Sequence, residues 1–139
     1  MLIYFVLCSA FTTFVPAMDI KEEEKVGKDN PAGDIKRLLI KRKLYQDPHF
    51  SAQQLAEMMG ISAFKLSRII RTELGTTYTD IVHSLRVEDA MRHLKDKRFA
   101  PYSIDDIGKM VGFNNRQSFF TAFKKITGTT PERFRQTPQ

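Results

Sequence analysis

The chain has 139 residues, enough for one compact unit or two small subdomains and too few for a further large domain. It carries 22 Lys and Arg against 16 Asp and Glu, and the excess lies after residue 33, where 19 basic residues accompany 11 acidic ones. This charge favours a polyanionic partner, although acidic proteins and membrane surfaces would also be attracted. The single cysteine, Cys8, excludes an intramolecular disulfide and any zinc site built from several cysteines.

Residues 1–18 contain no charged side chain. As a helix they would span about 27 Å, close to the ~30 Å of membrane hydrocarbon. We expect a cytoplasmic protein, and we favour the interpretation that this segment ends a membrane or sensor region, most of which is missing from this chain, and tethers the protein. A signal peptide cleaved after Ala17 and a helix packed on the domain are the alternatives.

Residues 19–33 are polar and end in turn-forming residues, which predicts a linker and a domain boundary. Asp34 is expected to cap a helix that continues to about Tyr45 and ends before Pro48. The apolar residues expected on its buried side are Ile35, Leu38, Leu39 and Leu44. The basic residues between them are interpreted as solvent-exposed, in preference to direct contact with phosphate.

Residues 51–75 predict two short helices joined at Gly60. The buried face of the second helix is expected to consist of Leu66, Ile69, Ile70 and Leu74. Its outward face and flanks consist of Phe64, Lys65, Ser67, Arg68 and Arg71. For Phe64 two interpretations stay open, namely simple packing and contact with the methyl group of a thymine.

Residues 77–95 predict one long helix whose apolar stripe changes sides. The residues that share a face in its first half are Tyr78, Ile81, Val82 and Leu85. Nearly the opposite face of its second half carries Val87, Ala90, Met91 and Leu94. Such a stripe suits a helix whose two ends pack on two different subdomains.

Residues 102–135 predict a second pair of helices and a short third one. Ser103 with Asp106 is typical of a helix start, and Gly108 permits another helix to approach closely. The other boundaries are expected at Gly112, at Asn114 or Asn115, at Gly128 and at Thr130-Pro131. The longer helix is expected to bury Phe119, Ala122, Phe123 and Ile126. Its opposite face is expected to carry Gln117, Thr121 and Lys124, flanked by Arg116 and Phe120. Polar groups so placed can reach base edges in a major groove.

The two pairs are copies of one pattern. Ser51 matches Ser103, and Gly60 matches Gly112. With one additional residue in the second turn, the later matches are Leu66 with Phe119, Ile70 with Phe123 and Gly75 with Gly128. A repeat of this kind favours two helix-turn-helix units over a helical hairpin with a solvated charged stripe. The predicted fold is all-α and homeodomain-like, with about seven helices: a first unit in residues 34–75, a connecting helix in 77–95 and a second unit in 102–135.

The chain resembles the DNA-binding region of the AraC/XylS family of bacterial transcription regulators in two runs, GISAFKLSRIIRTELG and VGFNNRQSFFTAFKKITGTTPERFR. The resemblance covers residues 34–135. It implies transcription regulation through double-stranded DNA, with two recognition helices in successive major grooves, RNA polymerase as a partner and control by an upstream sensor region. Because both units lie in one chain, a monomer can span two grooves about 34 Å apart.

The resemblance also implies which residues contact DNA. The positions at which the family contacts bases are Phe64, Ser67, Arg68, Arg116, Gln117 and Thr121. The positions near phosphates are Lys65, Arg71, Asn114, Asn115, Lys124 and Lys125. Arg can pair with guanine and Gln with adenine through two hydrogen bonds, each good pair discriminating by about 1–3 kcal/mol. Ser67 is short, so Arg68 is expected to dominate in the first unit, and Phe120 takes a position that is often small and polar in the family.

No catalytic pattern accompanies the repeat. His49, His83 and His93 are scattered, and the sequence has no HExxH motif, paired cysteines or glycine-rich phosphate loop. We therefore predict no enzyme activity, no cofactor and no metal site. Related domains also occur fused to DNA-repair methyl-acceptor modules, but Cys8 lacks the metal-ligand partners that such a module needs. The alternative function is a basic helical module that docks on an acidic protein or RNA without reading DNA.

Overall fold

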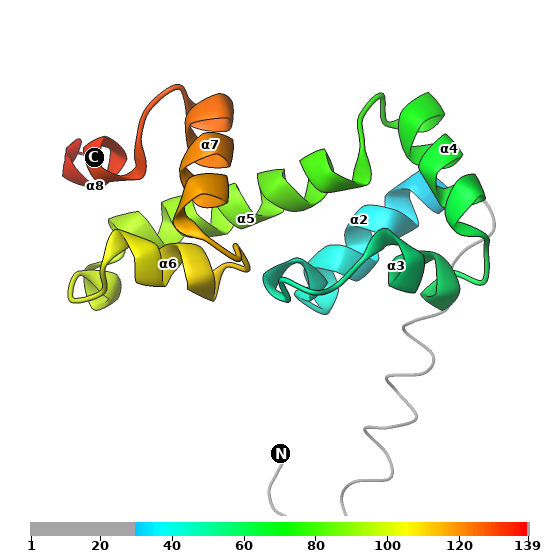
Figure 1. Cartoon of the computed structure of the whole chain (residues 1–139), viewed down its shortest axis with the longest axis horizontal. Helices are drawn as coiled ribbons and strands as arrows, with labels where there is room; N and C mark the ends of the chain where they lie inside the picture. The colour runs from blue at the N-terminus through cyan, green and yellow to red at the C-terminus, as the bar shows by residue number, and fades with distance from the viewer. Residues whose placement is uncertain (1–29, 139) are drawn as a thin grey trace, which may run out of the picture. The chain divides into compact units, whose positions relative to one another are not determined.

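The computed structural model describes residues 30–138, and every regular element among them is helical. The α-helices of this range are α2 (Pro31–Lys41), α3 (Ala52–Met58), α4 (Ala63–Glu73), α5 (Tyr78–Lys95), α6 (Ile104–Met110), α7 (Arg116–Thr127) and α8 (Pro131–Gln136) (Figure 1). Two short 3₁₀ helices are η1 (Leu44–Gln46) and η2 (Lys97–Phe99). The predicted all-α architecture is confirmed: α3–α4 and α6–α7 are the two helix-turn-helix pairs, and α5 joins them.

The apolar segment of residues 1–18 and residues 19–29 of the predicted linker lie outside the described residues. The predicted linker extends to residue 33, but residues 31–33 are helical. Within residues 30–138, no helix is both long and apolar enough to cross a membrane. Helix α2 begins at Pro31 and not at Asp34 as predicted, because the fixed φ of proline suits the first helical position. Asp34 therefore does not cap the helix but lies in its first turn, where it is 7% exposed and pairs with Arg37.

The prediction that this helix continues to about Tyr45 is also wrong, since α2 ends at Lys41. Lys43 adopts the left-handed conformation with a φ of 53°, and η1 follows. This break directs Tyr45 into the interior, where it is 5% exposed and its hydroxyl donates to Asp89 of α5. A contact between distant residues thus overrides the local helical pattern of this stretch.

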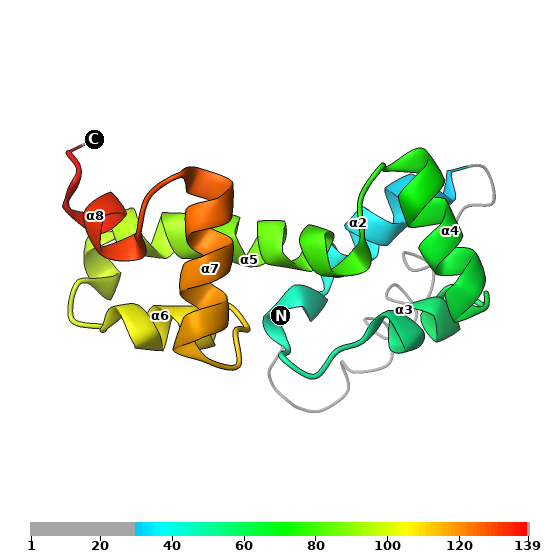
Figure 2. The ribbon, with the colours of Figure 1, turned by 45° about the horizontal axis from the view of Figure 1, so that its top comes forward.

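The long helix α5 is shared by the two units, as its changing stripe predicted. Thr77 caps it by accepting a hydrogen bond from the Asp80 amide. Its first half buries Ile81 and Val82. Its second half buries Val87, Ala90 and Leu94 in a cluster with residues of α6 and α7. Figures 1 and 2 show the two units at opposite ends of this helix.

Phenylalanine rings fill the core of the second unit. Phe119 and Phe123 of α7 meet edge to face with ring centroids 5.7 Å apart, and neither is more than 1% exposed. The predicted close approach at Gly108 is confirmed, because a Cβ added there would lie 2.5 Å from Cδ2 of Phe119. The prediction of a buried Ile126 is wrong, since it is 43% exposed. The last turn of α7 extends beyond the core cluster, which on this helix ends at Phe123.

The predicted repeat extends to the helix caps. Ser51 and Ser103 each form a capping box at the start of the first helix of their unit. Ser62 and Asn115 each cap the second helix by accepting from the amide three residues later. Residues 59–62 connect α3 to α4 and residues 111–115 connect α6 to α7, so the extra residue lies in the second turn as predicted.

We predict that Phe123→Ala lowers the free energy of unfolding by about 3–5 kcal/mol, because it removes a fully buried ring and leaves a cavity. Urea denaturation followed by circular dichroism measures the change. The matched control is Ile126→Ala on the exposed side of the same helix, which should cost less than about 1 kcal/mol. Equal losses in the two variants would contradict the assignment of Phe123 to the core.

Candidate nucleic-acid interface

The outward face of α4 carries a row of three large side chains. Leu66 and Ile70 hold its inner side in the core, each being at most 1% exposed. This leaves Phe64, Arg68 and Arg71 exposed at helical spacing on the opposite side. Phe64 is 78% exposed. Of the two interpretations of this side chain, simple packing and contact with a thymine methyl group, the first is therefore wrong within the described part of the chain. The ring therefore lies exposed at the start of the row, next to Lys65 and followed by the two arginines.

The helix α7 presents a second row at the equivalent positions of the repeat. Phe119 and Phe123 hold its inner side, and the outward row is exposed. The Gln117 Nε2 atom lies 3.4 Å from Oγ1 of Thr121, so these two polar groups adjoin each other on the surface. The equivalent pairs of the two rows are Phe64 with Gln117, Arg68 with Thr121, and Arg71 with Lys124.

All the residues predicted to contact DNA are exposed. Those of the first unit lie on α4, and those of the second lie on α7 or in the turn before it (Figure 2). Asn115 is also the N-cap of α7, because its Oδ1 accepts from the Ser118 amide at 2.8 Å. Asn114, directly before it, is exposed as well. The fold therefore brings the predicted residues together as two separate surfaces, one on each unit.

The cations of the two surfaces differ in their partners. Among residues 30–138, neither Arg68 nor Arg71 forms an ion pair. Lys125 of α7 lies with its Nζ 3.4 Å from Oδ1 of Asp80 on α5. The hydrogen bond from Thr77 and the contact with Lys125 lower the pKa of the Asp80 carboxyl, which is therefore charged at neutral pH. The α4 surface thus offers uncompensated positive charge, while part of the α7 charge is already neutralised.

Arg116 begins α7, and both neighbouring helices hold its guanidinium. The Nη1 atom pairs with Asp105 of α6, and Nη2 lies 3.2 Å from Oε1 of Glu132 on α8. The guanidinium also lies over the Phe120 ring, 4.1 Å from its centroid. Phe120 packs partly against the core of the second unit, so its ring lies between that core and the Arg116 guanidinium. The Arg116 side chain is therefore accessible to a ligand, but it already forms two ion pairs and a cation–π contact within the protein.

The sequence did not reveal Asp105 and Glu132 as partners of Arg116. They stand 11 and 16 residues away, and each lies in the first turn of a helix, where an acidic side chain is already explained by the helix dipole. No local spacing pairs either carboxylate with Arg116. Only the packing of α6 and α8 beside α7 brings the three groups together.

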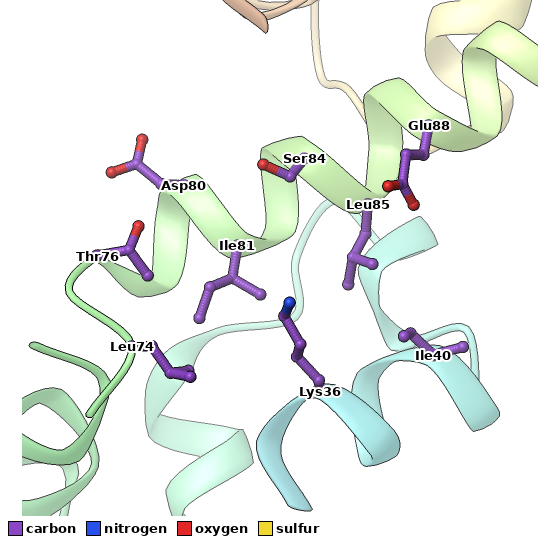
Figure 3. A pocket seen from close by; sticks show the side chains of 9 residues that line it. All are labelled: Lys36, Ile40, Leu74, Thr76, Asp80, Ile81, Ser84, Leu85 and Glu88. Carbon is purple, nitrogen blue, oxygen red and sulfur yellow. The ribbon is translucent and has the colours of Figure 1, made fainter. Parts of the chain in front are cut away.

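A hollow of about 290 Å³ lies apart from these surfaces, between α2 and the first half of α5 (Figure 3). Its lining includes the apolar side chains of Ile40, Ile81 and Leu85 and the charged side chains of Lys36 and Glu88. None of the predicted DNA contacts lines it. Within the described range, no group of three or more His, Cys, Asp and Glu residues is placed to hold a metal ion.

Two exposed helices, each the second helix of a helix-turn-helix pair and each carrying polar or basic side chains outward, define a tandem helix-turn-helix domain. Residues 55–137 match the model of a family described as "Helix-turn-helix domain". The chain belongs to the AraC/XylS family of DNA-binding transcription regulators, and the resemblance seen in its sequence is confirmed.

The chain is 32% identical over 108 residues to the probable transcription factor PqrA of Proteus vulgaris, covering 78% of this chain and 85% of PqrA. It is 34% identical to the bifunctional transcriptional activator/DNA repair enzyme AdaA of Bacillus subtilis, covering 66% of this chain but 44% of AdaA. Other curated relatives are longer still, and the chain spans 24% of the Bacillus subtilis regulatory protein YesN. Among solved structures, the C-terminal domain of AraT, a response regulator from Geobacillus stearothermophilus, is similar with a TM-score of 0.64 and 28% identity, covering 76% of this chain and 86% of that domain.

The ion pair between Arg116 and Asp105 should be weak, because the side chains are 54% and 44% exposed. A double-mutant cycle of Arg116→Ala and Asp105→Asn, measured by urea denaturation, is expected to give a coupling of about 0.2–1 kcal/mol. The coupling should shrink further when NaCl is raised to about 1 M, which screens exposed charges. A coupling above about 2 kcal/mol that persists at high salt would mean that Arg116 is locked to its protein partners.

Proposed function

We propose that the exposed rows on α4 and α7 read base sequence in successive major grooves of one DNA duplex, and that the chain regulates transcription through this binding. The observation that carries the proposal is the equivalence of the rows, which occupy the same positions in the two copies of the repeat, at opposite ends of α5 (Figure 1). A major groove is about 12 Å wide and admits one α-helix. Grooves on one face of the duplex recur about every 34 Å, so one monomer can occupy two of them.

In the first unit, Arg68 and Phe64 are the proposed base contacts, with the shorter Ser67 beside them. Arg68 has no acidic partner within residues 30–138, and a free guanidinium can bind O6 and N7 of guanine. The exposed ring of Phe64 can contact a thymine methyl group. Lys65 and Arg71 flank this row and are proposed to neutralise phosphates, which supplies affinity without sequence preference.

In the second unit, Gln117 and Thr121 are the proposed base contacts, since an amide can pair with N6 and N7 of adenine. Lys124 and Lys125 are proposed to meet phosphates, and so are Asn114 and Asn115 at the start of the helix. Arg116 is also proposed to contact a base edge. It must then exchange Asp105 and Glu132 for DNA, and the exposure of all three side chains supports such an exchange.

We further propose that the protein acts without a cofactor and without catalysis of its own, through RNA polymerase and under control of an upstream sensor region. A membrane tether through residues 1–18 and a cytoplasmic location likewise stay predictions. The longer relative AdaA is a bifunctional transcriptional activator and DNA repair enzyme, whereas the sequence around Cys8 of this chain supplies no metal-ligand pattern.

The competing function is a basic module that docks on an acidic protein or RNA without reading DNA. Such a module needs only positive charge on its surface. The outward rows also contain Phe64, Gln117 and Thr121, which carry no charge. These side chains add little to attraction between charged surfaces, but they suit the donors, acceptors and methyl groups of base edges. The composition of the rows therefore favours DNA reading.

In vitro selection from a random duplex pool tests the proposal, with the full chain at two salt concentrations. Two enriched motifs are expected, with centres about one helical turn apart, because each unit reads one groove. Retained DNA should decrease at the higher salt, since phosphate contacts release counterions. Salt-sensitive binding without any enriched motif would contradict base reading and favour the interaction module.

Two substitutions on α7 should have opposite signatures. Gln117→Ala should lower discrimination at one or two base pairs by about 1–3 kcal/mol, because it removes a base contact. Lys124→Ala should weaken cognate and scrambled duplexes alike and reduce the slope of log affinity against log salt by about 1. Fluorescence anisotropy titrations at several salt concentrations measure both effects. If Gln117→Ala weakened the two duplexes equally, the assignment of the base-reading face would be wrong.

A further inference from the structure

A buried polar junction connects the loop after α2, the middle of α5 and the turn of the second unit. Arg86 on α5 is 8% exposed, and its Nε donates to the carbonyl oxygen of Tyr45 at 2.5 Å. Its Nη2 donates to the carbonyl oxygen of Asp47 at 3.1 Å. The same guanidinium lies 5.5 Å from the ring centroid of Phe113, in the second unit. One buried side chain therefore contacts both units.

Gly112 lets the turn of the second unit approach this junction. A Cβ added to it would lie 2.6 Å from the carbonyl oxygen of Tyr45 and 2.8 Å from Nε of Arg86. Its φ is 112°, a conformation that other residues rarely adopt. The equivalent Gly60 of the first unit has a φ of 69° and no atom within 4 Å of an added Cβ. The same turn position is therefore filled by the neighbouring unit in one copy and open in the other.

Asp89 supplies a second connection across the junction. It is 6% exposed, and its Oδ2 accepts from the Tyr45 hydroxyl at 3.1 Å and from Gln46 Nε2 at 2.7 Å. Arg92 pairs with its Oδ1 at 2.8 Å. Burial raises the pKa of Asp89, but the hydrogen bonds from Gln46, Arg92 and Tyr45 together outweigh it and bring the pKa below its ordinary value. The carboxylate is therefore charged at neutral pH and can hold its donors in fixed directions.

We propose that this junction fixes the separation of the two reading helices, so that the protein selects operators by the spacing between their two half-sites. The proposal rests on the proposed function, since it assumes that both units read the same duplex. Apolar contacts are non-directional and permit small rotations, whereas the hydrogen bonds of the junction define one arrangement. One inserted base pair displaces the second half-site by about 3.4 Å and rotates it by about 35°. A rigid pair of units cannot follow this change.

The test uses the duplex recovered by selection, the same duplex with one base pair inserted between the half-sites, and each half-site alone. The wild-type chain should lose at least about tenfold in affinity on the insertion. The junction variant Arg86→Gln removes the hydrogen bonds to the Tyr45 and Asp47 carbonyls and the contact with the Phe113 ring. It should lose about threefold or less, because its units can readjust. Its affinity for each single half-site should be unchanged. Tyr78→Phe is the matched control, since it removes a hydroxyl bond to the Phe50 carbonyl but none of the hydrogen bonds of the junction, and it should behave as wild type.

A second measurement, without DNA, separates loss of rigidity from loss of folding. The parent chain for this measurement carries Cys8→Ser, and spin labels are attached through Glu73→Cys and Ile126→Cys. Pulsed electron paramagnetic resonance then reports the distance between α4 and α7. One narrow distance distribution is expected for the parent chain and a broader one for the junction variant. Gly112→Ala should shift or broaden the distribution, whereas Gly60→Ala should leave it unchanged.

Equal spacing losses in wild type and junction variant, with narrow distance distributions in both, would overturn the role of the junction. A selection that yields no paired motifs would instead contradict the proposed function, while the distance measurement would still report on the junction. The two failures are therefore distinguishable.

Discussion

The central constraint on this structure is that α5 must bury different faces in two cores. Its first half places Ile81 in the interior, and its second half places Val87 and Leu94 among the aromatic rings of the second unit. A large rotation of either unit about α5 would bring apolar surface into water, at about 25 cal/mol for each Å² exposed. Because α4 and α7 are anchored in these cores, the connecting helix α5 determines how the outward rows of α4 and α7 are oriented relative to each other.

The two units use one scaffold for different surface chemistry. The row on α4 combines an aromatic ring with cations that have no acidic partner among residues 30–138, whereas the row on α7 combines an amide, a hydroxyl and a lysine. In the second unit, Arg116 is already paired with Asp105 and Glu132. The long-range attraction for a polyanion is therefore stronger at the first unit. Under the proposed function, the second unit relies more on short-range contacts, which act only once the DNA is close.

The features that the sequence predicted correctly are those with local signals. Apart from the start of α2, the helix caps, turn glycines and the changing stripe of α5 depend on spacings within a few residues, and duplication made the caps and glycines of the two helix pairs easier to recognise. The missed features depend on contacts between distant residues. The early end of α2 follows from Tyr45, whose partners Arg86 and Asp89 stand 41 and 44 residues away. Ile126 lies beyond the core cluster, which ends at Phe123 on this helix, and no spacing within α7 marks that limit.

In the proposed complex, the exposed ring of Phe64 gives DNA binding an apolar component in addition to its charged one. If the ring closes against a thymine methyl group, the apolar surface that leaves water contributes a negative heat-capacity change. The phosphate contacts of the lysines contribute chiefly through counterion release, which depends on salt. Temperature and ionic strength therefore act on separable parts of the same interface. Calorimetry over a range of both would resolve the share of the aromatic contact from that of the charges.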